Sequence, residues 1–266
     1  MIKFFRKIRQ NMIKENKASK PAMPAGRYLK YAIGEIFLVV IGILIALQIN
    51  NCNENRKMNH QKNSYLKRLI QENKEDLVTF TNEIERLQNN NTVIVNLSNA
   101  FKDKNCSDSL LVKSANNYLI FGTLYPTVIP STSTFEDLSN TGNLSVIKNT
   151  ELRDQIVSHY KNYEFMKWTF KIDSDWAIPI DAALFTDTDA LRFDSNKTSF
   201  LFPDASIEMQ AKELREEQAI YTRNAAIHYW INDHSINYLK KVKEETLDFI
   251  GLLEKANKNE RLTKND

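Results

Sequence analysis

The sequence predicts a mostly α-helical protein, in which one transmembrane helix precedes a helical bundle with a long continuous first helix. Residues 31–49 form an apolar segment of membrane-spanning length, and residues 55–101 contain neither glycine nor proline and repeat their apolar side chains with helical spacing. The 266-residue chain has only six glycines and lacks the motifs G-x-G-x-x-G and G-x-x-x-x-G-K-[ST]. Nucleotide-binding folds built on glycine-rich loops are therefore not expected.

The segment YAIGEIFLVVIGILIALQI at residues 31–49 is the predicted transmembrane helix. Its central residues 36–47 include no charged or strongly polar side chain. The segment is about 28 Å long, close to the ~30 Å hydrocarbon core of a bilayer. Glu35 lies near one edge and can reach the interface, so a structural role is favoured over a functional intramembrane acid. Gly42 and Ala46 form a small-x-x-x-small pair that would let two spans approach closely.

The charge distribution predicts the orientation of this span. Residues 1–30 carry nine Lys or Arg and one acidic residue, although the net charge of the whole chain is only +3. The positive-inside rule therefore places residues 1–30 in the cytoplasm and the domain at residues 50–255 outside, with residues 256–266 as a polar tail. The long charged segment and the absence of an A-x-A site favour an uncleaved signal anchor over a signal peptide.

Residues 1–13 are typical of a short basic amphipathic helix. Lys3, Arg6, Lys7 and Arg9 lie mostly between the apolar residues of this segment. We expect this anchor to dock on an anionic leaflet of the lipid bilayer; the alternative is that its charges only enforce topology. No nucleic acid is expected as a partner, because the basic patch is tethered at the membrane and carries no recognised nucleic-acid-binding fold.

Residues 55–101 are predicted to form one helix that continues from the span. Its apolar side chains keep a 4-3 spacing at Leu66, Ile70, Leu77, Phe80, Ile84, Leu87, Ile94 and Phe101. Asn73 falls in the same register. The pattern fits the core face of an intramolecular bundle, which we favour, or the coiled-coil seam of a parallel homodimer in which Asn73 fixes the register.

Capping residues predict the remaining helix boundaries. The expected N-caps are Ser107, Ser133 of a capping box, Asn149 or Thr150, and Asp204 or Ser206, and the expected left-handed C-cap is Gly142. The helix after Ser107 is expected to reach Ile120, and the last helical region to reach about Asn257. Residues 179–203 are bounded by two prolines and have poor periodicity, so we expect them to be irregular.

No motif predicts a catalytic centre, a cofactor or a metal site. The motifs H-E-x-x-H and G-x-S-x-G are absent, and His228 and His234 are six residues apart, on different faces of a helix. The acidic segment at residues 187–194 fails the calcium-loop pattern at Leu191 and Arg192. We therefore expect no catalytic residues, no cofactor and no metal, and lean towards a protein that is not an enzyme.

Two further groups of residues are candidate sites. The aromatic residues Tyr160, Tyr163, Trp168 and Trp176 have helical spacing, which is typical of a core; the alternative is a ligand or partner surface. Cys52 and Cys106 would lie in an oxidising compartment, where a disulfide is allowed. An intrachain bond needs Cα atoms within about 7 Å, and a Cys52–Cys52 link between chains is an alternative.

The N-terminal segments MIKFFRKIRQ, KYAIGEIFLVVIGILIALQINN and NENRK resemble the signature of an uncharacterised bacterial family of single-pass membrane proteins. A looser resemblance covers TFEDLSNTGNLSVIKNTELRDQIVSHY at residues 134–160. Family members usually carry Trp where this chain has Cys52. The resemblance implies a membrane protein with a helical extracytoplasmic domain and supplies no activity.

These observations leave three hypotheses. The leading one is a single-pass protein of the bacterial inner membrane whose periplasmic helical domain binds an envelope protein partner or a small ligand. The alternatives are an envelope enzyme with a site around residues 160–176 and 187–194, and a sensor subunit that signals through a partner protein. A convergent buried polar cluster would favour the enzyme, and a wide exposed apolar patch would favour the binding module.

Overall fold

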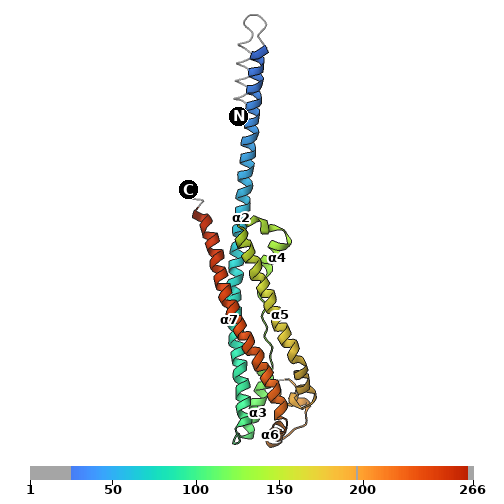
Figure 1. The fold of residues 1–266 in the computed structure, drawn as a ribbon. Helices are drawn as coiled ribbons and strands as arrows, with labels where there is room; N and C mark the ends of the chain where they lie inside the picture. Colours follow the sequence, from blue (N-terminus) through green and yellow to red (C-terminus); the bar gives the residue numbers. More distant parts are fainter. Residues whose placement is uncertain (1–24, 196, 263–266) are drawn as a thin grey trace. The chain divides into compact units, whose positions relative to one another are not determined.

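The computed structural model describes residues 25–195 and 197–262, in which it contains six α-helices and no strand (Figure 1). The predicted basic anchor, with Lys3, Arg6, Lys7 and Arg9, lies outside the described residues. Contacts divide the chain into two units, Met1–Met58 and Asn59–Asp266. The second unit is the helical domain, and the two units are described separately below.

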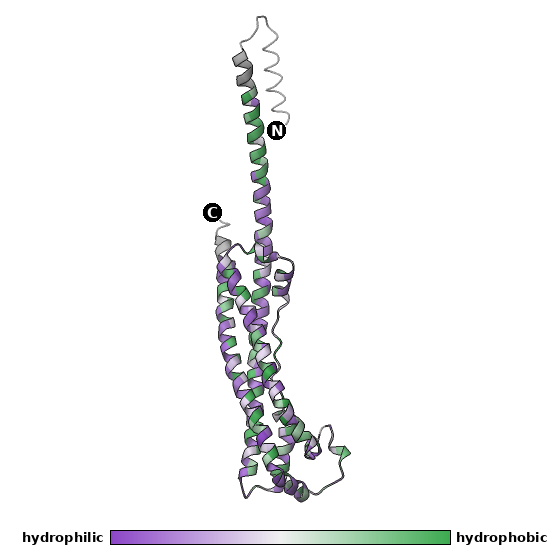
Figure 2. Cartoon of the chain, turned by 45° about the vertical axis from the view of Figure 1, so that its right-hand side comes forward, coloured by the Kyte–Doolittle hydropathy of each residue, from purple (hydrophilic) through white to green (hydrophobic). Residues whose placement is uncertain are grey.

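The first unit contains the apolar start of α2 (Ala25–Lys102). An 18-residue stretch of this helix has a mean hydropathy of 2.5, and none of its residues is buried. Figure 2 shows this stretch as an almost uniformly hydrophobic segment. Among the described helices, α2 alone is long and apolar enough to cross a membrane, which is compatible with the predicted membrane anchor.

The helical domain is built on three long helices that lie side by side: the later part of α2, α5 (Thr150–Thr186) and α7 (Gln218–Leu262) (Figure 1). The short helices α3 (Asp108–Asn117) and α6 (Ile207–Glu216) pack together at one end, and α4 (Ser133–Asn140) lies at the other. Residues from α2, α5 and α7 share one hydrophobic core, which includes Leu66, Phe80, Ile156, Met166 and Leu239. The apolar face of α2 therefore packs within its own chain, as the favoured bundle interpretation predicts.

The buried face of α2 agrees with the prediction in one series of positions and differs in part of the other. Residues 66, 73, 80, 84, 87 and 94 are buried as expected. A further buried series is 69, 76, 83, 90 and 97, each one residue before a predicted position. Three members of this series are Asp76, Glu83 and Asn90. A search for apolar spacing misses them because their side chains are polar.

The acids of the buried face hold an extended segment, residues 123–132, against α2. Glu83 accepts a hydrogen bond from the backbone N–H of Thr127 at 2.7 Å, and Asp76 accepts one from the N–H of Ser131 at 2.8 Å. Glu72 accepts a longer one from the N–H of Thr134 at 3.3 Å. We call Glu72, Asp76 and Glu83 the carboxylate row. It supplies acceptors to backbone N–H groups that have no strand beside them, and this offsets part of the cost of burying Asp76 and Glu83.

Arg86 strengthens the contact between Glu83 and the extended segment. Its guanidinium forms two hydrogen bonds to Glu83, at 2.8 and 2.7 Å, and a third to the backbone carbonyl of Tyr125 at 2.7 Å. One side chain therefore neutralises a buried carboxylate and also binds the extended segment directly.

Most of the predicted caps are present. Ser107, Asn149 and Ser206 accept hydrogen bonds from the N–H groups of Leu110, Leu152 and Met209, respectively. Gly142 has a φ of 72°, the left-handed conformation that glycine adopts without a Cβ penalty. These boundaries depend on local hydrogen bonds, which is why the sequence predicts them well.

Two predicted boundaries differ from the structure, the first because a tertiary contact takes the capping group. Helix α4 begins at Ser133, but its N-cap is Thr132, and the Ser133 hydroxyl donates to Glu72 at 2.7 Å instead of capping the helix. Helix α3 ends at Asn117 and continues as a single π-helical turn, η1 (Tyr118–Gly122). A Cβ at Gly122 would collide with the Tyr118 ring, so this turn requires glycine.

The expected irregular segment starts later than predicted. Helix α5 continues through Pro179 to Thr186. Pro179 cannot donate to the carbonyl of Asp175, but both residues lie on the exposed side, where water can reach that carbonyl. The 3-10 turns η3 (Ala190–Phe193) and η4 (Ser199–Leu201) follow. The last helical region is two helices, α6 and α7, with Glu217 between them, and α7 extends beyond Asn257.

We expect Glu83→Ala to destabilise the helical domain by about 2–4 kcal/mol, because it leaves Arg86 and the Thr127 N–H without their acceptor. Glu85→Ala is the matched control: its side chain is exposed on the same helix, and its loss should change stability by no more than about 0.5 kcal/mol. Thermal unfolding of the full chain in detergent, followed by circular dichroism, compares the two. Equal losses would contradict the structural role of the carboxylate row.

Candidate functional site

Five large apolar side chains lie exposed on the outer faces of α5 and α7. Phe165, Trp168, Ile172 and Trp176 come from α5, and Trp230 comes from α7; their exposed fractions lie between 43% and 57%. We call these five residues the aromatic strip. It contains all three tryptophans of the chain. Tryptophan is a residue that folded proteins usually bury to a large extent, so a strip with three half-exposed tryptophans is a candidate interaction surface.

Ring contacts join the strip across the seam between α5 and α7. The Phe165 and Trp168 ring centroids are 5.6 Å apart, and Trp176 meets Trp230 edge to face at 5.4 Å. Trp230 also stacks on His234 at 5.1 Å. His234 in turn contacts Asp173 of α5, with 2.7 Å between Nδ1 and Oδ2. The aromatic rings are thus held in place by their neighbours before any partner binds.

The aromatic residues proposed as a partner surface separate into two pairs. Trp168 and Trp176 are exposed, whereas Tyr160 and Tyr163 are 1% and 0% exposed and belong to the core. The two tyrosines face inward because α5 turns its Tyr160, Tyr163 and Phe170 positions towards α2 and α7. The tyrosines therefore belong to the core, and the two tryptophans lie on the surface of the domain.

Asn73 organises the buried tyrosines. Its Nδ2 donates to the Leu69 carbonyl at 2.8 Å and to the Tyr160 hydroxyl at 3.1 Å. Its Oδ1 accepts from Nε2 of His159 at 2.7 Å and from the Tyr163 hydroxyl at 3.1 Å. The amide thus uses its full hydrogen-bonding capacity. Asn73 fixes how α2 packs against α5 within one chain, so its role as the register residue of a dimer stalk is not supported.

Burial shifts two ionisable groups beside this network. Burial lowers the pKa of His159 to about 4, so its imidazole is neutral at pH 7. Burial raises the pKa of Asp76 to about 6, even though the Ser131 N–H favours its charged form. Both side chains form hydrogen bonds with other groups of the same chain, so we assign them to the packing of the domain.

A second polar group lies between the two hydrophobic clusters of the domain. Asp181 of α5 accepts hydrogen bonds at Oδ1 from Asn224 at 2.7 Å and from Nε2 of His228 at 2.8 Å. The Tyr125 hydroxyl donates to Asp181 Oδ2. We call Tyr125, Asp181, Asn224 and His228 the polar layer. Burial opposes ionisation of Asp181, but the hydrogen bonds from His228 and Tyr125 outweigh it and lower its pKa.

The polar layer has the residue types of a catalytic group but not the accessibility. The His228 side chain is 0% exposed, and that of Asp181 is 14% exposed. A general base needs to reach a substrate proton at hydrogen-bond distance. The layer therefore joins α5, α7 and the extended segment. Sequence reasoning missed it, although Asn224 and His228 lie four residues apart on the same face of a predicted helix, which was a usable signal.

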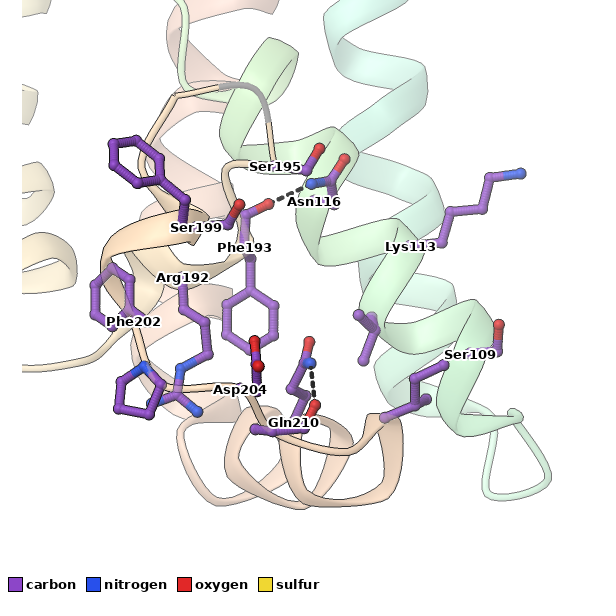
Figure 3. Close-up of a pocket in the computed structure, with 15 residues that line it drawn as sticks. Ser109, Lys113, Asn116, Arg192, Phe193, Ser195, Ser199, Phe202, Asp204 and Gln210 are labelled. Carbon is purple, nitrogen blue, oxygen red and sulfur yellow. Dashed lines mark hydrogen bonds between the residues drawn. The ribbon is translucent and has the colours of Figure 1, made fainter.

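Fifteen residues line a pocket of about 530 Å³ between α3, α6 and the segment that carries η3 and η4 (Figure 3). Arg192 forms ion pairs with Asp189 at 2.9 Å and with Glu213 at 3.4 Å. Asn116 donates to the Phe193 carbonyl, and Gln210 donates to the Ala205 carbonyl. These polar groups hold the segment in place, and the acids already compensate the charge of Arg192. The charge of Arg192 is thus not free to select a ligand, and the other charged residues of the lining, Lys113 and Asp204, are exposed to solvent.

In the acidic segment at residues 187–194, Asp189 forms an ion pair with Arg192, which is a structural contact within the segment. Within the described parts of the chain, no group of three or more His, Cys, Asp or Glu side chains is placed to hold a metal ion.

The predicted membrane residues Glu35, Gly42 and Ala46 lie on the exposed apolar part of α2. Gly42 has open space around it, with nothing within 4 Å of an added Cβ. Both cysteines are free thiols: Cys52 is exposed and Cys106 is buried.

The sequence model of a family of unknown function, DUF6090, matches residues 35–172, slightly more than half of the chain. The chain therefore belongs to this family, in agreement with its resemblance to an uncharacterised family. The match includes the apolar segment from Glu35 onwards and the first part of α5 with Trp168, and it ends before Trp176. No curated protein and no solved structure matches the chain.

The raised pKa of Asp76 predicts a pH-dependent effect of Asp76→Asn. Because the folded pKa, about 6, exceeds the ordinary value of 3.8, Asp76 lowers stability as the pH rises from about 4 to 6. The amide of the introduced asparagine cannot ionise, so the cost of burying a charge is removed. Its oxygen still accepts the hydrogen bond from the Ser131 N–H. We therefore expect the variant to be more stable by about 2 kcal/mol at pH 7.5 and equal to the wild type near pH 4.

Thermal unfolding at both pH values tests this prediction. Asp154→Asn, on the exposed surface of α5, is the control and should show no difference between the two conditions. A gain of the same size at pH 4 and pH 7.5 would show that the charge of Asp76 is not its cause.

Proposed function

We propose that this protein is a single-pass protein of the bacterial inner membrane that displays its helical domain on the periplasmic side and binds a protein partner through the aromatic strip. The single observation that carries the binding role is the exposure of Trp168, Trp176 and Trp230 on one surface. Tryptophan is enriched among the residues that contribute most to protein–protein binding energy.

The anchoring part of the proposal rests on α2 and on the charges before it. The apolar stretch of α2 is fully exposed, so it needs an apolar environment outside the described chain. Nine Lys or Arg precede it, whereas Arg56, Lys57 and Lys62 are the basic residues that follow within the next fifteen. This asymmetry supports a cytoplasmic N-terminus.

A protein partner suits the strip better than a small ligand does. From Phe165 to Trp176 the strip covers about 16 Å of α5, and side chains from a second helix widen it. Small ligands usually bind in concave sites that surround them. An enzyme is less well supported, because the His228 side chain of the polar layer is buried and Arg192 of the pocket is already paired with two acids.

Cys52 provides a direct test of the orientation, because its thiol is exposed shortly after the span. In reduced spheroplasts that contain the full chain, we expect a membrane-impermeant maleimide to label the protein without lysis. Cys52→Ser should abolish this labelling, because Cys106 is buried. Labelling that requires permeabilised membranes would contradict the proposed topology.

The binding role is tested with a photo-crosslinking amino acid in place of Trp168 in native membranes. We expect a discrete adduct that is lost when Trp176 and Trp230 are both changed to alanine, because each tryptophan contributes about 2 kcal/mol or more to such a surface. The matched control carries the same group in place of Val78, which is 60% exposed on α2.

The tryptophan substitutions need a check of the fold. Since Trp176 and Trp230 are half exposed, their replacement should change the free energy of unfolding by no more than about 1–2 kcal/mol, and helicity should stay unchanged. An adduct that forms equally at positions 168 and 78, or that persists without the tryptophans, would contradict binding through the strip.

A further inference from the structure

We infer that the occupant of the aromatic strip is a second copy of this chain, so that the strip pairs with itself about a two-fold axis. The inference rests on the proposed function, because it names the partner of the same surface. Four observations support it: the spacing of the strip residues on α5, the common direction of the two chains, the charges beside the strip and the area of the strip.

The first argument is the spacing of the strip on α5. Ile172 follows Trp168 by four residues and Phe165 by seven, and Trp176 lies four residues further on. Spacings of three and four positions keep these residues on one face of α5, as in the seam along which two helices pair. The outer face of α5 thus offers a second helix-pairing seam, in addition to the inner face that serves the bundle.

The second argument is direction. Two copies inserted through the same span carry identical flanking charges, so they enter the membrane with the same orientation. Their α5 helices then run the same way, as a parallel seam requires. A two-fold axis places the aromatic strip of one copy against the same strip of the other. The result is a closed dimer in which both strips are covered.

The third argument is the charge along the edges of the strip. Lys171 pairs with Asp175 at 2.6 Å, and both side chains are more than half exposed. Lys167 pairs with Glu164 at 2.7 Å. A strongly acidic or basic partner would leave one member of each pair opposed to a like charge. A second copy presents both signs in equal number, so its edges match without net repulsion.

The fourth argument is area. Five half-exposed side chains of this size present roughly 500 Å² of apolar surface, at the upper end of what monomers expose. A standard interface buries about 800 Å² on each partner. The strip and its charged edges together approach that size, with an apolar centre and a polar rim.

The test uses cysteine crosslinking of the full chain in native membranes. In a Cys52→Ser background, which removes the other exposed thiol, Ile172→Cys places one thiol at the centre of the seam. We expect mild oxidation or a short bis-maleimide to give a covalent dimer. The matched control Val78→Cys, on α2, should give at least about fivefold less dimer. Trp168→Ala with Trp176→Ala should reduce the Ile172→Cys dimer at least about fivefold while helicity is retained.

The photo-crosslink at position 168 separates this inference from the proposed function. An adduct with twice the mass of the chain supports the second copy. A strip-dependent adduct with a different protein, together with no Ile172→Cys dimer, overturns the second copy and leaves the proposed binding role in place. No adduct and no dimer would overturn both.

Discussion

The helical domain depends on the hydrogen-bond acceptors that α2 presents to its neighbours. Asp76 and Glu83 accept from backbone N–H groups of an extended segment that has no strand beside it, and Glu72 accepts from the Thr134 N–H in the first turn of α4. In the same stretch of α2, Asn73 joins α2 to α5 through two tyrosines and a histidine. Burying polar groups is unfavourable unless they find hydrogen-bond partners, so these contacts favour a single packing of the helices.

This constraint gives the domain an unusual distribution of residue types. Acids, amides and histidines occupy much of the interior, whereas Trp168, Trp176 and Trp230 lie outside. Polar contacts inside specify how the long helices align. That alignment places the three tryptophans together across the α5–α7 seam, although Trp230 is far from the other two in the sequence. The interior thus determines the surface through which we propose that the protein binds.

Local signals predicted the helices well, and their failures have physical causes. Ser107, Asn149 and Ser206 cap the helices as expected, because a cap needs only the next few residues. Ser133 does not, because Glu72, 61 residues away in the chain, takes its hydroxyl. The predicted buried face of α2 was incomplete for a related reason: Asp76, Glu83 and Asn90 are buried although apolar spacing cannot indicate them.

The sequence by itself determined the class of the protein. Apolar length identifies the candidate membrane helix, helical periodicity and scarce glycine identify the helical domain, and both are properties of contiguous residues. The tertiary structure alone decided which aromatic residues are core and which are surface. Tyr160, Tyr163, Trp168 and Trp176 share one helix, and only its contacts with α2 and α7 determine which of its faces is covered. The polar layer needed the tertiary structure as well, because its members come from α5, α7 and an extended segment that meet only in the folded domain.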